Sequence, residues 1–180
     1  MQPPTLYAED PHFMMPQKFL SNDVYKEALE SLVIVVTDVL FVDRAKKTIY
    51  LAKRKVKPMQ DFWLIGGRVL AGEDAIYSIR RCVKRETGLE LPADRFQFLT
   101  LNRYLWKDRA QEPQEKGADT LGYTFAVDLS PEERSVAAQN LDSDEYDTNY
   151  GLQEFDVAGL ADHPMRQAIT DLYTRTFEKR

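Results

Sequence analysis

The sequence contains little cysteine and little histidine. Its 180 residues include one cysteine, Cys82, and two histidines, His12 and His163. A single cysteine excludes an internal disulfide framework and is typical of a protein in a reducing compartment. Cys82 lies within a predicted helix, where we expect a packed thiol rather than a reactive one.

Long hydrophobic runs and an excess of positive charge are also missing. The most apolar run, residues 32–42, is about half the ~20 residues that a transmembrane helix needs. The chain begins Met-Gln-Pro-Pro, without the basic start and apolar core of a signal peptide. The net charge of −5 argues against a polyanion as the main partner. We therefore expect a cytoplasmic protein with neither a membrane nor a nucleic-acid polymer as partner, although a local basic patch still allows a small anionic ligand.

No repeat, low-complexity tract or long linker divides the chain, which is long enough for one domain with its own core. We expect residues 1–30 to form an N-terminal arm with a short helix, and residues 31–180 to form the domain. Four prolines within residues 1–19 favour an extended arm. The aromatic residues of the arm suggest packing on the domain or on a second subunit, so a homodimer and a loose tail both remain open.

Hydrophobic patterns predict a domain of alternating strands and helices. Residues 32–42 are rich in Val, Ile and Leu, which is typical of a strand buried on both faces. Further strands are expected at residues 48–54, 62–65, 96–106, 120–129 and 152–155. Helical segments are expected at residues 74–87, in a short turn after Pro131, and after Pro164.

The most informative stretch is Gly66-Gly67-Arg68-Val69, read as a glycine-rich turn, together with the helix that follows it. Glycines let the backbone approach a ligand closely. On the helix, Glu86 falls within the apolar stripe and near the C-terminus, where burial and the helix dipole both disfavour a negative charge. This carboxylate needs a partner, which is either a nearby arginine or a metal ion with a phosphate beyond it.

The spacing of these residues resembles the Nudix box, the signature of the Nudix hydrolase family. The match includes Gly67, Glu73, Arg81, Val83, Glu86, Gly88 and Leu89. Cys82 and Arg85 stand where the box has two further glutamates, so Glu86 alone is retained of three. The resemblance covers about residues 31–177 and implies an α/β/α sandwich around a mixed sheet.

Nudix hydrolases cleave a nucleoside diphosphate joined to another group, using Mg²⁺ or Mn²⁺. The resemblance implies that Glu86 and the carbonyl of Gly67 bind the metal ion. It also implies that Glu73 ties the glycine segment to the helix through Arg81. With Cys82 and Arg85 in place of glutamates, we expect no more than one ion.

One branch of the family, the GDP-mannose mannosyl hydrolases, is similar over a longer stretch. Its box also retains a single glutamate at the position of Glu86. The resemblance assigns Asp38 to the active site, and Arg54 and Arg68 to the leaving diphosphate. Tyr150 stands where this branch has the histidine that acts as general base. The resemblance thus implies a GDP-mannose-like nucleotide sugar as substrate.

The general base remains open, because tyrosine is a poor base near neutral pH and neither histidine lies at the expected position. Glu145 and Asp147 are alternatives, although acidic loop residues are usually only solvated. The leading hypothesis is a Mg²⁺-dependent hydrolase of a nucleotide sugar or related compound. Its alternatives are a catalytically weak or inactive Nudix domain that binds or senses a nucleotide or sugar phosphate, and a scaffold for protein interactions.

Overall fold

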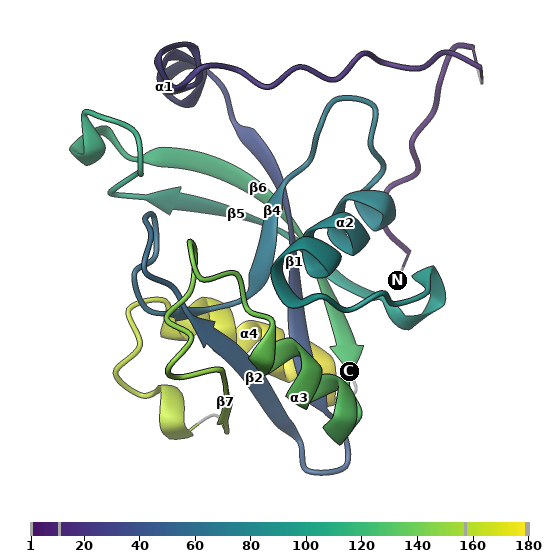
Figure 1. Ribbon diagram of the computed structural model, residues 1–180, viewed down its shortest axis with the longest axis vertical. Helices are drawn as coiled ribbons and strands as arrows, with labels where there is room; N and C mark the ends of the chain where they lie inside the picture. The colour runs from purple at the N-terminus through teal and green to yellow at the C-terminus, as the bar shows by residue number, and fades with distance from the viewer. Residues whose placement is uncertain (1, 11, 157, 179–180) are drawn as a thin grey trace.

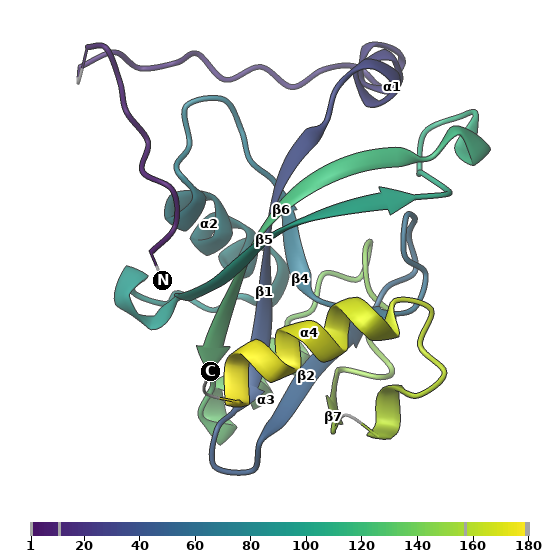
Figure 2. The ribbon, with the colours of Figure 1, turned by 180° about the vertical axis from the view of Figure 1, so that it is seen from behind.

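The protein folds as a mixed β-sheet enclosed between helices, as seen in a computed structural model (Figures 1 and 2). The structure describes residues 2–10, 12–156 and 158–178. Figure 1 shows α2 and α3 on one face of the sheet, and Figure 2 shows α4 across the other face. The predicted α/β/α sandwich is confirmed. Among the described residues, no helix is long and apolar enough to cross a membrane.

Within the described residues the sheet has seven strands, with the order β3-β2-β1-β6-β5 and with β4 and β7 off this path. Strand β1 pairs with β6 in parallel and with β2 and β4 in antiparallel fashion. The bounds are β1 Ile34–Asp43, β2 Thr48–Lys53, β3 Phe62–Trp63, β4 Ile65–Arg68, β5 Gln97–Trp106, β6 Ala118–Asp128 and β7 Leu152–Phe155. The predicted strands are present with their ends shifted by a few residues, except that the strand predicted at residues 62–65 falls into two strands, β3 and β4.

Helices α2 and α3 begin at side chains that cap their first turns. Helix α2 has the Asp74 side chain as its N-cap and ends at Gly88, whose φ of 71° is left-handed. Ser130 and Glu133 form a capping box at the start of α3, which is a full helix where only a short turn was predicted. The bounds are α1 Asn22–Ser31, α2 Ala75–Thr87, α3 Pro131–Gln139 and α4 Arg166–Phe177, with short 3-10 turns at Ala93–Arg95, Gln114–Lys116 and Ala158–Leu160.

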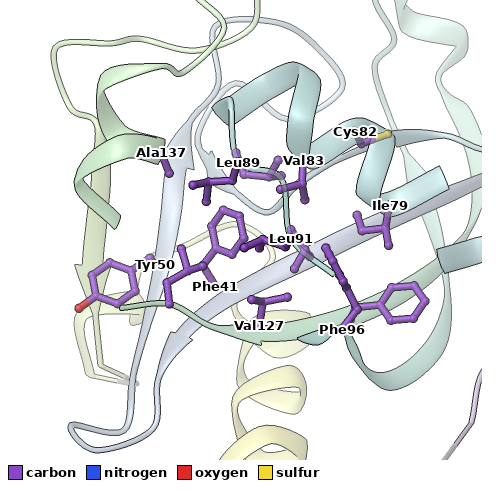
Figure 3. Packing of buried hydrophobic residues seen from close by; sticks show 14 of the residues in the cluster. Phe41, Tyr50, Ile79, Cys82, Val83, Leu89, Leu91, Phe96, Val127 and Ala137 are labelled. Atoms are coloured by element: carbon purple, nitrogen blue, oxygen red, sulfur yellow. The ribbon is translucent and has the colours of Figure 1, made fainter. Parts of the chain in front are cut away.

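Two apolar clusters hold the helices to the two faces of the sheet. The cluster under α2 and α3 includes Phe41, Ile79 and Val83, which Figure 3 shows packed between the helices and the strands. The cluster under α4 includes Trp63 and Leu172. Burial of this apolar surface is the main stabilising term of the fold.

The two glycines read as a turn lie instead within strand β4, and this part of the prediction is wrong. Gly66 pairs with Asp38 of β1, and Gly67 pairs with Thr37. A Cβ at Gly66 would lie 2.2 Å from the carbonyl oxygen of Thr37 and 2.3 Å from the Asp38 carboxylate. The close approach of β4 to β1, rather than a turn conformation, therefore requires glycine here.

Strand β1 pairs along one edge with β2 at one end and with β4 at the other. An opening in the sheet lies between β2 and β4. Residues 41–43 of β1 pair with β2, whereas residues 36–39 pair with β4. Strand β2 turns away from β1 to pair with β3 through Ala52 and Lys53. Asp38 on β1, Arg54 just after β2, and Gly66 and Gly67 on β4 therefore border the same opening.

The arm before α1 runs over the segment between β4 and α2. Figure 1 shows it as the purple chain extending from α1 past this segment toward the N-terminus. Met15 of the arm lies against Gly72, where a Cβ would come within 2.8 Å of the Met15 side chain. Most of the large hydrophobic side chains of the arm are exposed, among them Tyr7, Phe13, Met14 and Phe19.

Candidate active site

A large cavity adjoins the opening between β2 and β4. Its volume is about 1130 Å³, which exceeds the few hundred Å³ of a small-ligand pocket and is enough for a ligand the size of a nucleotide sugar. Asp38, Arg54, Gly67, Arg68 and Arg81 all line it. The structure thus brings together residues that lie up to 43 positions apart in the sequence.

The lining of the cavity is strongly positive, although the whole chain is acidic. Among the described residues that line it, eight are Lys or Arg and three are Asp or Glu. Arg81, Lys84, Arg85 and Arg109 are each paired closely with a carboxylate. The remaining basic side chains favour an anionic ligand that carries several negative charges.

An aromatic wall faces part of the same cavity. Trp63 meets the rings of Tyr104 and Trp106 at centroid distances of 5.8 Å and 5.5 Å. Tyr25 of α1 also lines the cavity, and the Arg68 guanidinium lies 4.1 Å from the centre of its ring. Planar aromatic surface beside cationic side chains suits a ligand with a base at one end and phosphates at the other.

Glu86 is completely buried at the edge of the site. One carboxylate oxygen accepts a hydrogen bond from the Tyr146 hydroxyl, and the other pairs with the Arg85 guanidinium. Burial raises the pKa of Glu86, and the contacts with Tyr146 and Arg85 oppose that rise. An arginine, which is one of the two partners expected for this carboxylate, thus contacts Glu86, and it comes from the adjacent residue.

Arg54 and Arg85 meet at a second carboxylate, that of Glu145. Their Nη2 atoms lie 3.4 Å and 3.7 Å, respectively, from the Glu145 oxygens. The Nε of Arg54 is buried and has no hydrogen-bond partner among the described residues. An orphaned guanidinium donor in a cationic cavity is suited to a ligand oxygen.

Asp38 lies on β1 beside these charges. Burial raises the pKa of its carboxyl to about 7, with Arg54 opposing and Glu86 adding to the rise. A carboxyl group with a pKa near neutrality exchanges protons readily at physiological pH, as a general acid or base requires.

Glu73 and Arg81 form the pair that the resemblance implied. The Arg81 Nε donates to Glu73 at 2.6 Å, and its Nη2 donates to Glu73 at 2.8 Å and to the Arg68 carbonyl at 2.8 Å. Glu73 also accepts from the backbone of Leu70 at 2.9 Å. The pair thereby fixes the segment between β4 and α2, which carries Arg68 into the cavity.

Like Glu73 and Glu86, Tyr150 is a predicted site residue that does not line the cavity. Its ring lies 4.1 Å from the Lys53 ammonium and 5.7 Å from the ring of Phe62.

His163 lies by the start of α4, where its Nδ1 accepts from the Met165 backbone, and Cys82 is fully buried. Burial raises the pKa of the Cys82 thiol to about 11, which agrees with the packed thiol expected from the sequence.

Sequence reasoning missed the part played by Tyr146, which reaches Glu86 from 60 positions away. It also missed the aromatic wall and the contact of Tyr25 with Arg68. Glu145, one of the alternatives for the general base, contacts two arginines in the structure. The sequence does show aromatic residues close together at positions 104–106 and 146–150. Their spacing, however, does not predict which residues they contact.

A comparison with protein-family models identifies the family of this chain. The model of the NUDIX domain matches residues 34–172. The chain therefore belongs to the Nudix domain family. No curated protein sequence matches the chain significantly.

Solved structures of similar fold include Nudix hydrolases. A MutT NUDIX hydrolase from Burkholderia pseudomallei gives a TM-score of 0.59 at 19% identity, over 79% of this chain and 97% of the other. A MutT protein from Methanosarcina mazei Go1 gives 0.56 at 14% identity, over 79% and 91%. A UDP-X diphosphatase gives 0.52 at 16% identity, over 88% and 72%. At these identities the similarity shows the fold alone.

Nudix hydrolases generally use a divalent metal ion such as Mg²⁺, so the donor groups of this site must be compared with that requirement. The described residues contain no group of three His, Cys, Asp or Glu side chains suited to a metal ion. Glu86 and Gly67 are close, with the Cβ position of Gly67 3.9 Å from the nearer carboxylate oxygen. One carboxylate with substrate phosphates and water is a donor set that Mg²⁺ accepts. The residues present therefore fit one ion.

Proposed function

We propose that this protein is a hydrolase that cleaves a nucleoside diphosphate joined to another group, with a nucleotide sugar such as GDP-mannose as the favoured substrate. The observation that carries the proposal is the position of Asp38 beside Arg54 in a cationic cavity of about 1130 Å³. Arg68 lines the same cavity, as the resemblance to the mannosyl hydrolases implies. The favoured sugar nucleotide rests on that resemblance and on the size of the cavity.

In the proposed reaction, Arg54 and Arg68 bind the diphosphate and the aromatic wall receives the base. Asp38, in its ionised form, takes a proton from the water whose oxygen forms a bond to the sugar carbon. The bond between that carbon and the diphosphate oxygen breaks, and the nucleoside diphosphate leaves with its electrons. Guanidinium groups placed at the diphosphate stabilise the charge that develops on the leaving group. Glu86 and the carbonyl of Gly67 would hold Mg²⁺ or Mn²⁺, which when bound neutralises further charge on the diphosphate.

An assay against a panel of compounds tests this proposal. The purified protein is incubated with Mg²⁺ or Mn²⁺ and with nucleotide sugars, ADP-ribose and nucleoside triphosphates, and products are separated by anion-exchange chromatography. We expect turnover of at least one nucleotide sugar, and loss of that turnover in Glu86→Gln, whose circular dichroism spectrum should match that of the wild type. Absence of turnover across the whole panel with either metal would contradict the proposal.

The contact of Arg85 with Glu86 favours a second candidate function, which is binding or sensing without cleavage. In this structure the carboxylate expected to bind the metal ion is already paired with a cation. A pure binding protein would gain thermal stability from a nucleotide sugar but would release no product. The same panel, read by both thermal shift and chromatography, separates the two functions.

A further inference from the structure

Arg85 brings a permanent positive charge to the place between strand β4 and Glu86. Its Nη2 lies 3.4 Å from the Cβ position of Gly67 and contacts the Glu86 oxygen nearest to Gly67. Gly67 and Glu86 are the two residues expected to hold the metal ion. The guanidinium therefore lies where that ion would be, and a cation cannot bind the same oxygen closely without displacing it.

Arg54 and Arg85 retain unused capacity for hydrogen bonds. A guanidinium has five N–H donors. Within the described residues, Arg54 makes one side-chain hydrogen bond, to Glu145 at 3.4 Å, and its Nε is an orphan. Arg85 makes one, to Glu86. The contacts of both arginines with Glu145 are long, so Glu145 leaves most donors of the pair free for another oxygen-rich group.

The exposure of the two arginines suits a ligand that enters from the cavity. The Arg85 side chain is 48% exposed and the Arg54 side chain is 17% exposed. Both line the cavity, and they approach one another through their shared contact with Glu145. Two planar donor forks at neighbouring positions match the two phosphate groups of a diphosphate, because each fork can bind two oxygens of one phosphate.

We propose that Arg85 takes the place of the metal ion in ligand binding, so that Arg85 and Arg54 together bind a diphosphate in the absence of any divalent ion. The proposal rests on the proposed function only in taking a diphosphate as the ligand. It follows that a divalent ion must displace Arg85 before it binds Glu86. Loss of the Arg85 charge therefore weakens metal-free diphosphate binding and, in the ligand-free protein, tightens binding of a divalent ion.

Calorimetric titration with inorganic pyrophosphate tests the first consequence. In the presence of EDTA, wild-type protein should bind pyrophosphate with a Kd within about threefold of that measured with Mg²⁺, and Arg85→Gln should weaken the metal-free Kd by at least about tenfold, or ~1.4 kcal/mol. Lys46→Gln is the control, because it removes the same charge from an exposed side chain that lies outside the cavity and pairs with Glu154. We expect the control to change the Kd by less than about twofold.

Arg85→Glu makes the sharper prediction, since it restores a carboxylate at this position of the box. Its pyrophosphate binding should disappear in EDTA and return with Mg²⁺. Arg85→Lys keeps the charge and should bind pyrophosphate in EDTA more tightly than Arg85→Gln. This difference would show that the weaker binding of Arg85→Gln comes from the lost charge and not from misfolding. Titration of ligand-free protein with Mn²⁺ alone should show tighter binding in Arg85→Gln than in the wild type.

The proposal is overturned if wild-type protein binds pyrophosphate only with a divalent ion, or if Arg85→Gln and Lys46→Gln behave alike. These outcomes are independent of the proposed hydrolysis, because pyrophosphate binding in EDTA involves no turnover. Turnover of a nucleotide sugar without metal-free binding would leave the proposed function standing and remove this inference. Metal-free binding without turnover would support this inference and contradict the proposed function.

Discussion

The hydroxyl of Tyr146 donates a hydrogen bond to the buried carboxylate of Glu86, across 60 positions of the sequence. This contact ties the acidic loop before β7 to the C-terminal turn of α2. The backbone N–H of Asp142 strengthens the connection by donating to the Glu86 carbonyl at 3.0 Å. The loop that carries Glu145 is thereby fixed beside Arg54 and Arg85.

Tyr146→Phe should destabilise the protein by about 1–3 kcal/mol, because it leaves one oxygen of the buried Glu86 without its donor. Urea unfolding measures this difference. Tyr77→Phe is the control, because Tyr77 is 58% exposed and its hydroxyl makes no hydrogen bond within the described residues. Equal stabilities of the two variants would show that the Tyr146 hydroxyl contributes nothing to the fold.

Glu73→Gln should destabilise the protein by about 2 kcal/mol, because the carboxylate that Arg81 and the Leu70 backbone share loses its charge. Thermal unfolding measures the change. The control is Glu90→Gln, which breaks the exposed pair with Lys84 and should leave the melting temperature almost unchanged. A melting temperature of Glu73→Gln equal to that of the control would contradict the architectural role of the pair.

Gly66→Ala should destabilise the protein by about 1–3 kcal/mol through overpacking, because the added methyl group meets the Thr37 carbonyl and the Asp38 carboxylate. Gly159→Ala is the matched control, since its nearest contacts would be 3.5 Å away. Denaturant unfolding of both variants distinguishes them. Wild-type stability in Gly66→Ala would show that β4 does not approach β1 as closely as the structure indicates.

Asp38 should make stability fall as the pH rises. The folded protein keeps the Asp38 proton up to about pH 7, whereas the unfolded chain loses it near its ordinary pKa of 3.8. Between these values the folded state binds more protons, so this group's contribution to stability decreases with rising pH. The melting temperature of Asp38→Asn, relative to the wild type, should therefore be higher at pH 8 than at pH 5.

Asp162→Asn serves as the control for this measurement, because Asp162 is exposed and its carboxylate makes no hydrogen bond or ion pair within the described residues. Its melting temperature relative to the wild type should not change with pH. A pH-independent difference for Asp38→Asn as well would mean that Asp38 titrates normally in the folded protein.

The features that could be predicted from the sequence are those that depend on local chemistry. Asp74 and Gly88 mark the ends of α2 because capping requires particular residues at particular positions. The alternation and β-branched content of the strands likewise fix their positions to within a few residues. The resemblance to the Nudix family implied a mixed sheet between helices, but the order of its strands was not predicted, since periodicity alone does not specify pairing.

The contacts within the site could not be predicted, because they depend on tertiary structure. Successive residues on a helix point about 100° apart, so the pairing of Arg85 with Glu86 requires the long arginine side chain to reach back. Tyr146 reaches Glu86 only because the loop folds over α2. Gly66 was read as part of a turn that lets the backbone approach a ligand closely, whereas here glycine permits close contact between two strands.

The most direct test of the account is the hydrolysis of GDP-mannose by wild-type protein and Asp38→Asn between pH 5 and 9, followed by ³¹P NMR. We predict release of GDP by the wild type, with kcat/KM rising with pH and levelling off above about 7. Asp38→Asn should be slower by about 100-fold or more and should lack this inflection. Wild-type activity in Asp38→Asn with an unchanged pH profile, or no hydrolysis of GDP-mannose or any other nucleotide sugar, would contradict the account.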